Sequence, residues 1–293
     1  MPDPEPKHLR VIPRLDIKGP TLVKGVRMEG LRVLGRPEDF ARAYATDGAD
    51  ELLYLDVVAS LYGRNNLTEI VRRTAAEIFI PLTVGGGVRS LDDIQTLLRA
   101  GADKVAMNTA AIARPELVAQ AARAFGSQCV VVSIEAKEQP DGSFECYTDN
   151  GRERTGVEAV GWAKQVCELG AGELLVGSVD RDGTGSGFAL DLIRRLAAEL
   201  PIPVIAASGA GSKEHVQAAV CRGRADAVAV GSLLHYHYAP RLTARVEDLG
   251  LTEGNVAFLK GLIAGSQRPP IPEPIDLPGL KAALAAAGIS CRG

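Results

Sequence analysis

The sequence predicts a (β/α)8 barrel, in which eight parallel strands are each followed by a helix, built from two duplicated half-barrels. Three observations predict this fold. The chain has 293 residues, which suits a single α/β barrel. Short apolar runs alternate with segments of helical period along the chain. Segments of the first half of the chain are also repeated in the second half. We therefore expect one domain over residues 1–293.

The repeat is visible in three matched pairs of segments. The run "GADELLYLDV" from Gly48 returns as "GAGELLVGSV" from Gly170, and "IPLTVGGGV" from Ile80 returns as "IPVIAASGAG" from Ile202. A third pair, "ADKVAMNTA" and "ADAVAVGSL", keeps the same order and nearly the same spacing of about 122 residues. Three matches at one spacing indicate a duplicated half. A doubly wound sheet, the alternative fold, does not predict such a repeat.

The predicted elements follow in order along each half. The strand candidates are 11–17, 51–59, 80–86 and 103–109 in the first half, and 129–135, 173–179, 202–208 and 226–232 in the second. These runs are almost continuously apolar, as in parallel strands that are covered on both faces. Amphipathic runs at 36–50, 90–103 and 155–172 have the helical period that a barrel places outside its strands.

Composition and charge exclude several classes of protein. The formal net charge of −3 gives no basic field, which argues against a nucleic-acid partner. Four His and five Cys show no metal-ligand spacing, so no metal or cofactor is expected. No run reaches the ~20 apolar residues of a membrane helix, and "MPDPEPKHLR" has no apolar segment. We expect a cytoplasmic protein without a membrane partner.

Two carboxylates end corresponding strands of the two halves. Asp16 ends "VIPRLD", and Glu135 ends "VVVSIE". Active sites of such barrels lie at the C-terminal ends of the strands, so the repeat predicts that the two groups face each other across the barrel mouth. They are candidates for an acid–base pair if their environments separate their pKa values. The alternative is a pair of solvated or salt-bridged carboxylates, with Lys18 and Lys137 as partners.

Small residues end the third, fourth, seventh and eighth strands. The turns "VGGGV" and "SGAG" expose backbone N–H groups, which suit phosphate binding. Two such places on opposite sides of the mouth indicate a ligand with a phosphate at each end. The predicted phosphate-binding residues are Gly87, Asn108, Thr109, Gly209, Gly231 and Ser232.

The sixth strand ends in "SVDRDGTGSG", where Asp182 and Gly183 are further candidates for substrate binding. Asp182 could orient a substrate hydroxyl, or it could be a turn aspartate with a local role only. At the opposite end of the barrel, the strands are preceded or opened by charges of both signs. These are Arg10, Glu51, Lys104 and Glu173, which form either a salt-bridged plug or an ordinary solvated rim.

With these residues assembled, the chain resembles the cyclase subunit of imidazole glycerol phosphate synthase. The resemblance covers roughly residues 9–235 and resumes over "IDLPGLKAALAAAGIS". Its most specific motifs are "LDIKG", "DELLYLDVVAS", "TVGGGVRS", "GADKVAMNTAA", "GAGELLVGSVDRDGTGSG" and "SGAGSKEH". The sister isomerase family shares the half-barrel duplication and the phosphate sites, but "FGSQ" and "DRDGTGSG" favour the cyclase.

The resemblance implies a lyase of histidine biosynthesis that works as a heterodimer with a glutaminase subunit. Ammonia from the glutaminase would enter at the N-terminal mouth and cross the barrel. It would react with a bis-phosphorylated ribulosyl aminoimidazole nucleotide to give imidazole glycerol phosphate and an aminoimidazole carboxamide ribotide.

The resemblance also implies a role for individual residues. Asp16 matches the general base, and Glu135 stands where the general acid, an aspartate, is expected. Lys24 matches a residue of the mobile first loop, and Asp103 matches one that signals to the glutaminase. The ammonia gate is matched by Arg10, Glu51, Lys104 and Glu173.

The departures from the family pattern cluster at the catalytic end. Glu135 replaces an aspartate, Arg14 stands where a small residue is usual, and "KGPT" replaces a more usual "KDGR". An insertion at about 237–272 follows the eighth strand, in which "GNVAFLKGLI" is expected to form a short helix and "SQRPPIPEP" an extended run. Two alternatives therefore stay open. One is a paralogue that uses glutaminase-derived ammonia to aminate or amidinate a sugar nucleotide for surface glycans. The other is a non-catalytic barrel that activates a glutaminase.

Overall fold

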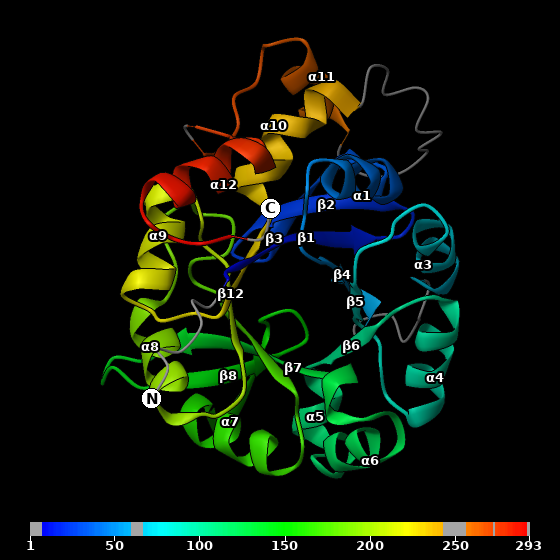
Figure 1. Ribbon diagram of the computed structural model, residues 1–293, viewed down its shortest axis with the longest axis vertical. Helices are drawn as coiled ribbons and strands as arrows, with labels where there is room; N and C mark the ends of the chain where they lie inside the picture. Colours follow the sequence, from blue (N-terminus) through cyan, green and yellow to red (C-terminus); the bar gives the residue numbers. More distant parts are fainter. Residues whose placement is uncertain (1–7, 60–66, 243–255, 272, 292–293) are drawn as a thin grey trace.

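The computed structural model describes residues 8–59, 67–242, 256–271 and 273–291. Figure 1 looks into a ring of strands surrounded by helices. The ring contains β1 (Arg10–Lys18), β4 (Leu52–Asp56), β5 (Leu82–Gly85), β6 (Lys104–Met107), β7 (Val130–Glu138), β10 (Glu173–Ser178), β11 (Val204–Ala207) and β12 (Ala227–Val230). All neighbours in the ring pair in parallel, and the pairing of β10 with β7 closes it. This confirms the predicted barrel.

Each predicted strand is present, and most are shorter than the apolar run that predicted them. The run 51–59, for example, gives a strand that ends at Asp56, because the chain turns at Val57. The apolar residues beyond such strand ends are buried in the turns instead. Val57 is 8% exposed and Ala59 is 1% exposed, so burial made the strand candidates look longer than they are.

Two antiparallel hairpins depart from the expected alternation. The strands β2 (Thr21–Val26) and β3 (Glu29–Gly35) follow β1, and β8 (Phe144–Thr148) and β9 (Glu153–Glu158) follow β7. A helix still follows the first and fifth barrel strands, but in both cases the hairpin comes before it. The two hairpins occupy corresponding places in the two halves, as a duplication predicts.

Helices cover the outside of the ring. They are α1 (Pro37–Thr46), α3 (Leu67–Ala75), α4 (Leu91–Ala100), α5 (Thr109–Ala113), α6 (Glu116–Phe125), α7 (Ala159–Glu168), α8 (Leu190–Glu199), α9 (Lys213–Cys221), α10 (Ser232–Leu242), α11 (Ala257–Ile263) and α12 (Leu277–Ala286). Several begin at side-chain caps, for example Ser90 on Asp93 N of α4 and Ser212 on His215 N of α9. Within the described residues, no helix is both long and apolar enough to span a bilayer.

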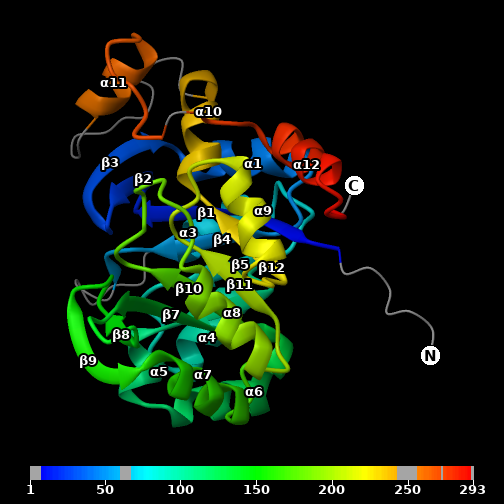
Figure 2. The same cartoon turned by 90° about the vertical axis from the view of Figure 1, so that its left-hand side faces the viewer.

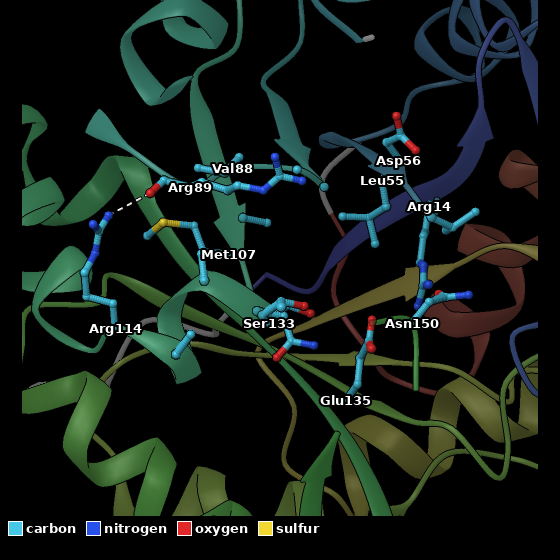
Figure 3. Close-up of a pocket in the computed structure, with 18 residues that line it drawn as sticks. Arg14, Leu55, Asp56, Val88, Arg89, Met107, Arg114, Ser133, Glu135 and Asn150 are labelled. Atoms are coloured by element: carbon cyan, nitrogen blue, oxygen red, sulfur yellow. Dashed lines mark hydrogen bonds between the residues drawn. The ribbon is translucent and has the colours of Figure 1, made fainter. Parts of the chain in front are cut away.

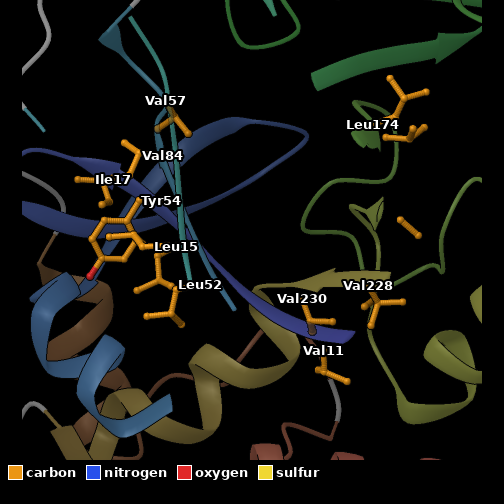
Figure 4. Packing of buried hydrophobic residues seen from close by; sticks show 14 of the residues in the cluster. Val11, Leu15, Ile17, Leu52, Tyr54, Val57, Val84, Leu174, Val228 and Val230 are labelled. Carbon is orange, nitrogen blue, oxygen red and sulfur yellow. The ribbon is translucent and has the colours of Figure 1, made fainter. Parts of the chain in front are cut away.

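The two faces of each barrel strand pack into different cores. Val11, Leu15 and Ile17 of β1 pack outward with Leu52 and Tyr54 against the helices (Figure 4). The inward residues form a separate cluster along the barrel axis, which contains Ile12, Leu53, Ala106, Val131, Leu175, Ile205, Ala207, Ala227 and Ala229. This alternation follows from the two-residue period of a strand, and it places Arg14 and Asp16 on the inward side.

The two hairpins fold over the C-terminal mouth of the barrel, and their tips meet there. Met28, at the β2–β3 turn, is buried together with Tyr147 of β8 and with Val179. The side chain of Asn150, in the β8–β9 turn, donates to the carbonyl of Met28 at 3.1 Å. The first hairpin also seats on the loop after β10, because a Cβ on Gly183 would lie 2.2 Å from the carbonyl oxygen of Gly25. The two hairpins thus cover the space in which the predicted site residues lie.

The segment after β12 reaches the outer side of the first hairpin (Figure 2). Phe258 of α11 lies under the guanidinium of Arg32 of β3, 4.7 Å from ring centroid to Cζ. Its ring is also 6.1 Å from the ring of Tyr236 in α10. The predicted short helix therefore exists as α11, and the residues of "SQRPPIPEP" that the structure describes are not helical. Residues 243–255 and Pro272 of the predicted insertion lie outside the described residues.

Candidate active site

At the N-terminal mouth, four charged side chains form a closed ring of ion pairs, which we call the entrance ring. Arg10 contacts Glu51 at 2.5 Å and Glu173 at 2.8 Å. Lys104 contacts the same two glutamates at 3.1 and 2.9 Å. Each charge therefore meets two charges of opposite sign. Burial lowers the pKa of Arg10, but the two glutamates outweigh that effect and raise it.

Asp103, the predicted signalling residue, lies at the same end of the barrel, but its side chain has a structural contact. Its Oδ2 accepts the N–H of Leu82 at 2.8 Å, at the start of β5. Asp50 accepts from Val11 N at 2.7 Å and Asp226 from Val204 N at 3.0 Å in the same manner. Three aspartates therefore anchor the start of a neighbouring strand in the same way, and Asp103 is one of them.

A cluster of buried charges lies at the C-terminal mouth. Lys24 of β2 bridges two aspartates, with Nζ 2.7 Å from Asp16 Oδ2 and 2.9 Å from Asp182 Oδ1. Arg14 donates from Nε to Asp16 Oδ1 at 2.8 Å, and Ser208 donates from Oγ to Asp182 Oδ2 at 3.0 Å. Burial alone raises the pKa of Asp16, but Arg14 and Lys24 outweigh it and lower that pKa to about 2. Asp16 is therefore held as an anion.

Glu135 has the opposite environment. Its Oε2 is buried and has no hydrogen-bond partner among the described residues. Burial raises the pKa of Glu135 to about 7, against the lowering effect of Arg14, which approaches it across the cavity in Figure 3. The two predicted catalytic carboxylates therefore have separated pKa values, as an acid and a base working near neutral pH require. Lys18 and Lys137, the salt-bridge partners that the alternative offered, make no ion pair with them in the described structure.

Two cavities open on opposite sides of this cluster. The first cavity, of about 390 Å³, is lined by Gly87, Asn108 and Thr109 and by Glu135 (Figure 3). The second cavity is smaller and is lined by Lys24, Asp182, Gly183, Gly209, Gly231 and Ser232. The structure thus brings together every residue predicted to bind substrate, and it divides them between two cavities as the repeat suggests.

Two of these residues carry unused hydrogen-bonding capacity into the cavities. Asn108 donates from Nδ2 to the carbonyl of Tyr147 at 3.0 Å, but its buried Oδ1 has no partner in the described part of the chain. The same holds for the buried Oγ of Ser232 at the start of α10. Thr109 instead holds the second hairpin, because its Oγ1 accepts the N–H of Asp149 at 3.2 Å.

Several residues of the site were not predicted as site residues. Arg89 and Arg114 line the first cavity, and Arg114 Nη2 donates to the carbonyl of Arg89 at 2.7 Å. Both lie shortly after predicted phosphate turns, which is the signal that could have identified them. Arg14 lines both cavities, and Ser208 lines the second. The two-residue period of β1 predicts that Arg14 and Asp16 point to the same side of the strand, but it does not predict how far the side chain of Arg14 extends.

The comparisons with known proteins agree with this geometry. A family model described as "Histidine biosynthesis protein" matches residues 10–240. The chain belongs to this family. A curated relative from Legionella pneumophila, named "Imidazole glycerol phosphate synthase subunit HisF", is 58% identical over 207 residues, which are 71% of this chain and 98% of the relative.

Relatives of the same name come from other bacterial lineages. The protein of Mycobacterium tuberculosis is 53% identical over 234 residues, which are 78% of this chain and 87% of the relative. That of Frankia casuarinae is 52% identical over 231 residues, which are 78% of this chain and 91% of the relative. The aligned lengths confirm the resemblance that the sequence motifs indicated, and they place the chain among the HisF proteins of its family.

Proposed function

We propose that the protein is the cyclase subunit of imidazole glycerol phosphate synthase. The observation that carries the proposal is that three buried polar atoms, which have no hydrogen-bond partner among the described residues, lie at the two cavities. They are Asn108 Oδ1, Glu135 Oε2 and Ser232 Oγ. A buried polar atom without a hydrogen bond costs free energy, so such an atom in a cavity is available to bind a ligand or a water. The family membership supports the substrate, a bis-phosphorylated ribulosyl aminoimidazole nucleotide.

The two cavities suit the two phosphate ends of this substrate. In the first cavity, Arg89 and Arg114 add positive charge beside the turn of Gly87. In the second, Lys24 lies beside the turn that contains Gly209. Arginine and lysine beside exposed backbone N–H groups are the usual ligands of phosphate. The substrate would span the mouth from one half-barrel to the other, over the charged cluster.

Glu135 and Asp16 would then supply the acid and base of the reaction. A carboxyl with a pKa of about 7 is partly protonated at neutral pH and can donate to a breaking bond. Asp16, held as an anion by Arg14 and Lys24, can receive a proton or stabilise positive charge on the reacting nitrogen. Asp182 shares Lys24 with Asp16, which fixes the position of that lysine on the first hairpin.

Ammonia would reach this site from the opposite end of the barrel. The entrance ring lies below the apolar inward cluster, and the charged site lies above it. Uncharged ammonia can cross an apolar interior at little cost, whereas ammonium would be desolvated. We propose that a glutaminase subunit docks on this end to form a heterodimer. Phe79, which is 97% exposed in the turn before β5, lies on the same face.

The segment at about 237–272 is proposed as an insertion that supports the first hairpin. Phe258 contacts Arg32 of β3, and β3 pairs with β2, which carries Lys24. A Cβ on Gly185 would lie 3.1 Å from the side chain of Ile271, so the insertion also approaches the loop after β10. None of its described residues lines either cavity. It would therefore act on the site through the hairpin.

Complementation tests the proposal. The gene is expressed in a bacterial strain that lacks its own cyclase subunit and requires histidine, with a glutaminase subunit supplied together with it. Growth without histidine, and formation of imidazole glycerol phosphate by the purified chain with ammonium, are the expected results. Folded protein that gives neither result would exclude the histidine pathway and leave the two alternatives, the sugar-nucleotide paralogue and the non-catalytic barrel that activates a glutaminase.

A further inference from the structure

Arg14 is a buried arginine inside the barrel. It is 6% exposed, and it stands on the inward side of β1 between Ile12 of the apolar cluster and Asp16 of the site. Arginine is almost never this buried unless it is paired. Its side chain reaches across the mouth to the end of β11, where Nη1 donates to Ser208 Oγ at 3.4 Å. The same nitrogen lies 3.7 Å from Asp182 Oδ2.

The main chain of Arg14 is fixed as well. Its carbonyl oxygen lies 2.8 Å from Nε2 of His235, a fully buried residue of α10. Nδ1 of His235 lies 2.6 Å from the hydroxyl of Tyr44 in α1. Since a carbonyl only accepts, Nε2 carries the proton, and the tyrosine hydroxyl donates to Nδ1. Burial lowers the pKa of His235 to about 4, so this histidine stays neutral and does not add charge beside Arg14.

Small inward residues leave the space that Arg14 fills. Ala106 and Ser133 line the first cavity with it, and Ala229 lines the second. Among the described residues, Arg14 is the one side chain that lines both cavities. A ligand that places one end in each cavity must therefore pass over its guanidinium.

Arg14 belongs to a cluster of four charged side chains, which does not include Glu135. Lys24 and Arg14 are two cations, and Asp16 and Asp182 are the two anions that contact them. This group is balanced without Glu135, which faces Arg14 from β7 but makes no ion pair with it in the described structure. Arginine does not lose its proton in proteins. Together with Lys24, Arg14 therefore keeps Asp16 ionised at any pH at which the enzyme works.

We propose that Arg14 is a positioning residue that assigns the acid and base roles in this site. It holds Asp16 as an anion and contacts Asp182 beside the second cavity, and it leaves Glu135 as the carboxyl that exchanges a proton with the substrate. The inference rests on the proposed cyclase function and extends it to a residue that does not itself transfer a proton.

The inference predicts the direction of a change in pH dependence. Arg14 lowers the pKa of Asp16 and of Glu135 through its charge, so replacing it with methionine should raise both pKa values. An opposite charge at this range shifts a carboxyl by about 1 to 3 pKa units. The alkaline limb, where Glu135 loses its proton, should move up by about one unit. Asp16 should begin to protonate in acid, where the wild type keeps it ionised.

The experiment measures kcat and KM of wild type, Arg14→Met and Arg14→Lys with ammonium between pH 5 and 9.5. The ratio of variant to wild-type activity at each pH removes the effect of pH on the ammonia supply. We expect kcat of Arg14→Met to fall about 100-fold near neutral pH, and the ratio to rise with pH. Arg14→Lys keeps the charge and should show less than half of that rise. Arg73→Met is the matched control, since Arg73 is half-exposed on α3 and pairs with Glu38.

The outcomes separate this inference from the proposed function. A wild-type enzyme without cyclase activity would refute the function itself. An active wild type with an Arg14→Met ratio that does not change with pH would overturn the inference alone. If Arg14→Met fails to fold, Ser208→Ala decides, because it removes one hydrogen bond from Arg14 and one from Asp182. A smaller rise of the same sign for Ser208→Ala supports the role of Arg14, and a flat ratio for Ser208→Ala refutes it.

Discussion

Asp16 and Asp182 share one ammonium group, because Nζ of Lys24 lies 2.7 Å from the first and 2.9 Å from the second. Asp16 belongs to the first half-barrel and Asp182 to the second, while Lys24 is carried by the hairpin that covers the mouth. The three residues therefore join the two halves and the hairpin at one point. The position of the hairpin and the arrangement of the charged site therefore depend on the same lysine.

Lys24→Met should remove the contact that joins the hairpin to Asp16 and Asp182. It leaves two buried aspartates with Arg14 alone, and breaking a buried ion pair costs about 3 kcal/mol or more of unfolding free energy. We expect kcat to fall at least about 100-fold and amide hydrogens of β2 and β3 to exchange faster. Lys18→Met is the control, since Lys18 is exposed at the end of β1. Unchanged exchange in the hairpin would show that other contacts hold it closed.

Asp16→Asn should abolish synthesis and keep the fold. General acid–base groups contribute about 100-fold or more to a rate, and an amide cannot replace the carboxylate. Removal of the charge from an unpaired buried carboxylate would relieve a burial cost. Asp16 is not such a group, because it neutralises Arg14 and Lys24. We therefore expect the unfolding free energy, measured in urea, to fall by about 2 kcal/mol. A variant with normal turnover would refute the catalytic assignment.

The barrel strands could be predicted because burial on both faces leaves a continuous apolar run, and the repeat then placed Asp16 opposite Glu135. The environments of these two carboxylates could not be predicted. They depend on the long side chain of Arg14, which contacts Asp16. They also depend on Lys24, which follows Asp16 by eight residues and contacts it because the hairpin folds back over the site. The second hairpin was missed because its strand β9 is largely exposed and so has no apolar run.

Glu135→Gln should change the dependence of stability on pH. The pKa of Glu135 is raised to about 7 in the fold from an ordinary 4.5, so the folded protein binds more protons than the unfolded chain between these values. The wild type therefore loses stability from this group as pH rises from about 4.5 to 7. The variant lacks this loss, so at pH 8 its free energy of unfolding should exceed that of the wild type by about 2 kcal/mol. This value is smaller than the full pKa shift would give, because the side chain is partly exposed.

Urea unfolding of both proteins at several pH values measures this difference. His235 acts in the opposite sense, since its lowered pKa costs stability as pH falls from about 6.5 towards 4. That contribution is common to both proteins and cancels in the comparison. Parallel stability curves for wild type and Glu135→Gln between pH 4.5 and 8 would show that Glu135 has an ordinary pKa.

Asp103→Asn tests the docking face, with Asp226→Asn as a matched control. Both aspartates anchor the start of a strand, so both variants should lose a similar amount of stability, about 1 kcal/mol. If Asp103 also faces a glutaminase, only its variant should lose glutamine-dependent synthesis while keeping synthesis with ammonium. Equal behaviour of the two variants in both assays would leave Asp103 with the structural role alone.

The contact of Phe258 with Arg32 allows a test of the segment after α10. Phe258→Ala removes the ring that lies under the Arg32 guanidinium and beside Tyr236, and a cation–π contact of this kind is worth about 1 kcal/mol. Neither cavity is lined by Phe258, so the chemistry of the site should be unchanged once the hairpin is closed. We therefore expect KM to rise about fivefold with little change in kcat at saturating substrate.

Hydrogen exchange provides the second measurement for Phe258→Ala. Amides of β3 should exchange faster than in the wild type, whereas those of the second hairpin, β8 and β9, should not change. Phe125→Ala is the control, because Phe125 is a partly buried phenylalanine of α6 that packs on the outer core. Its loss should lower stability without a specific effect on β3. If both variants raise KM equally, the effect is a general loss of stability, and the segment after α10 does not support the hairpin.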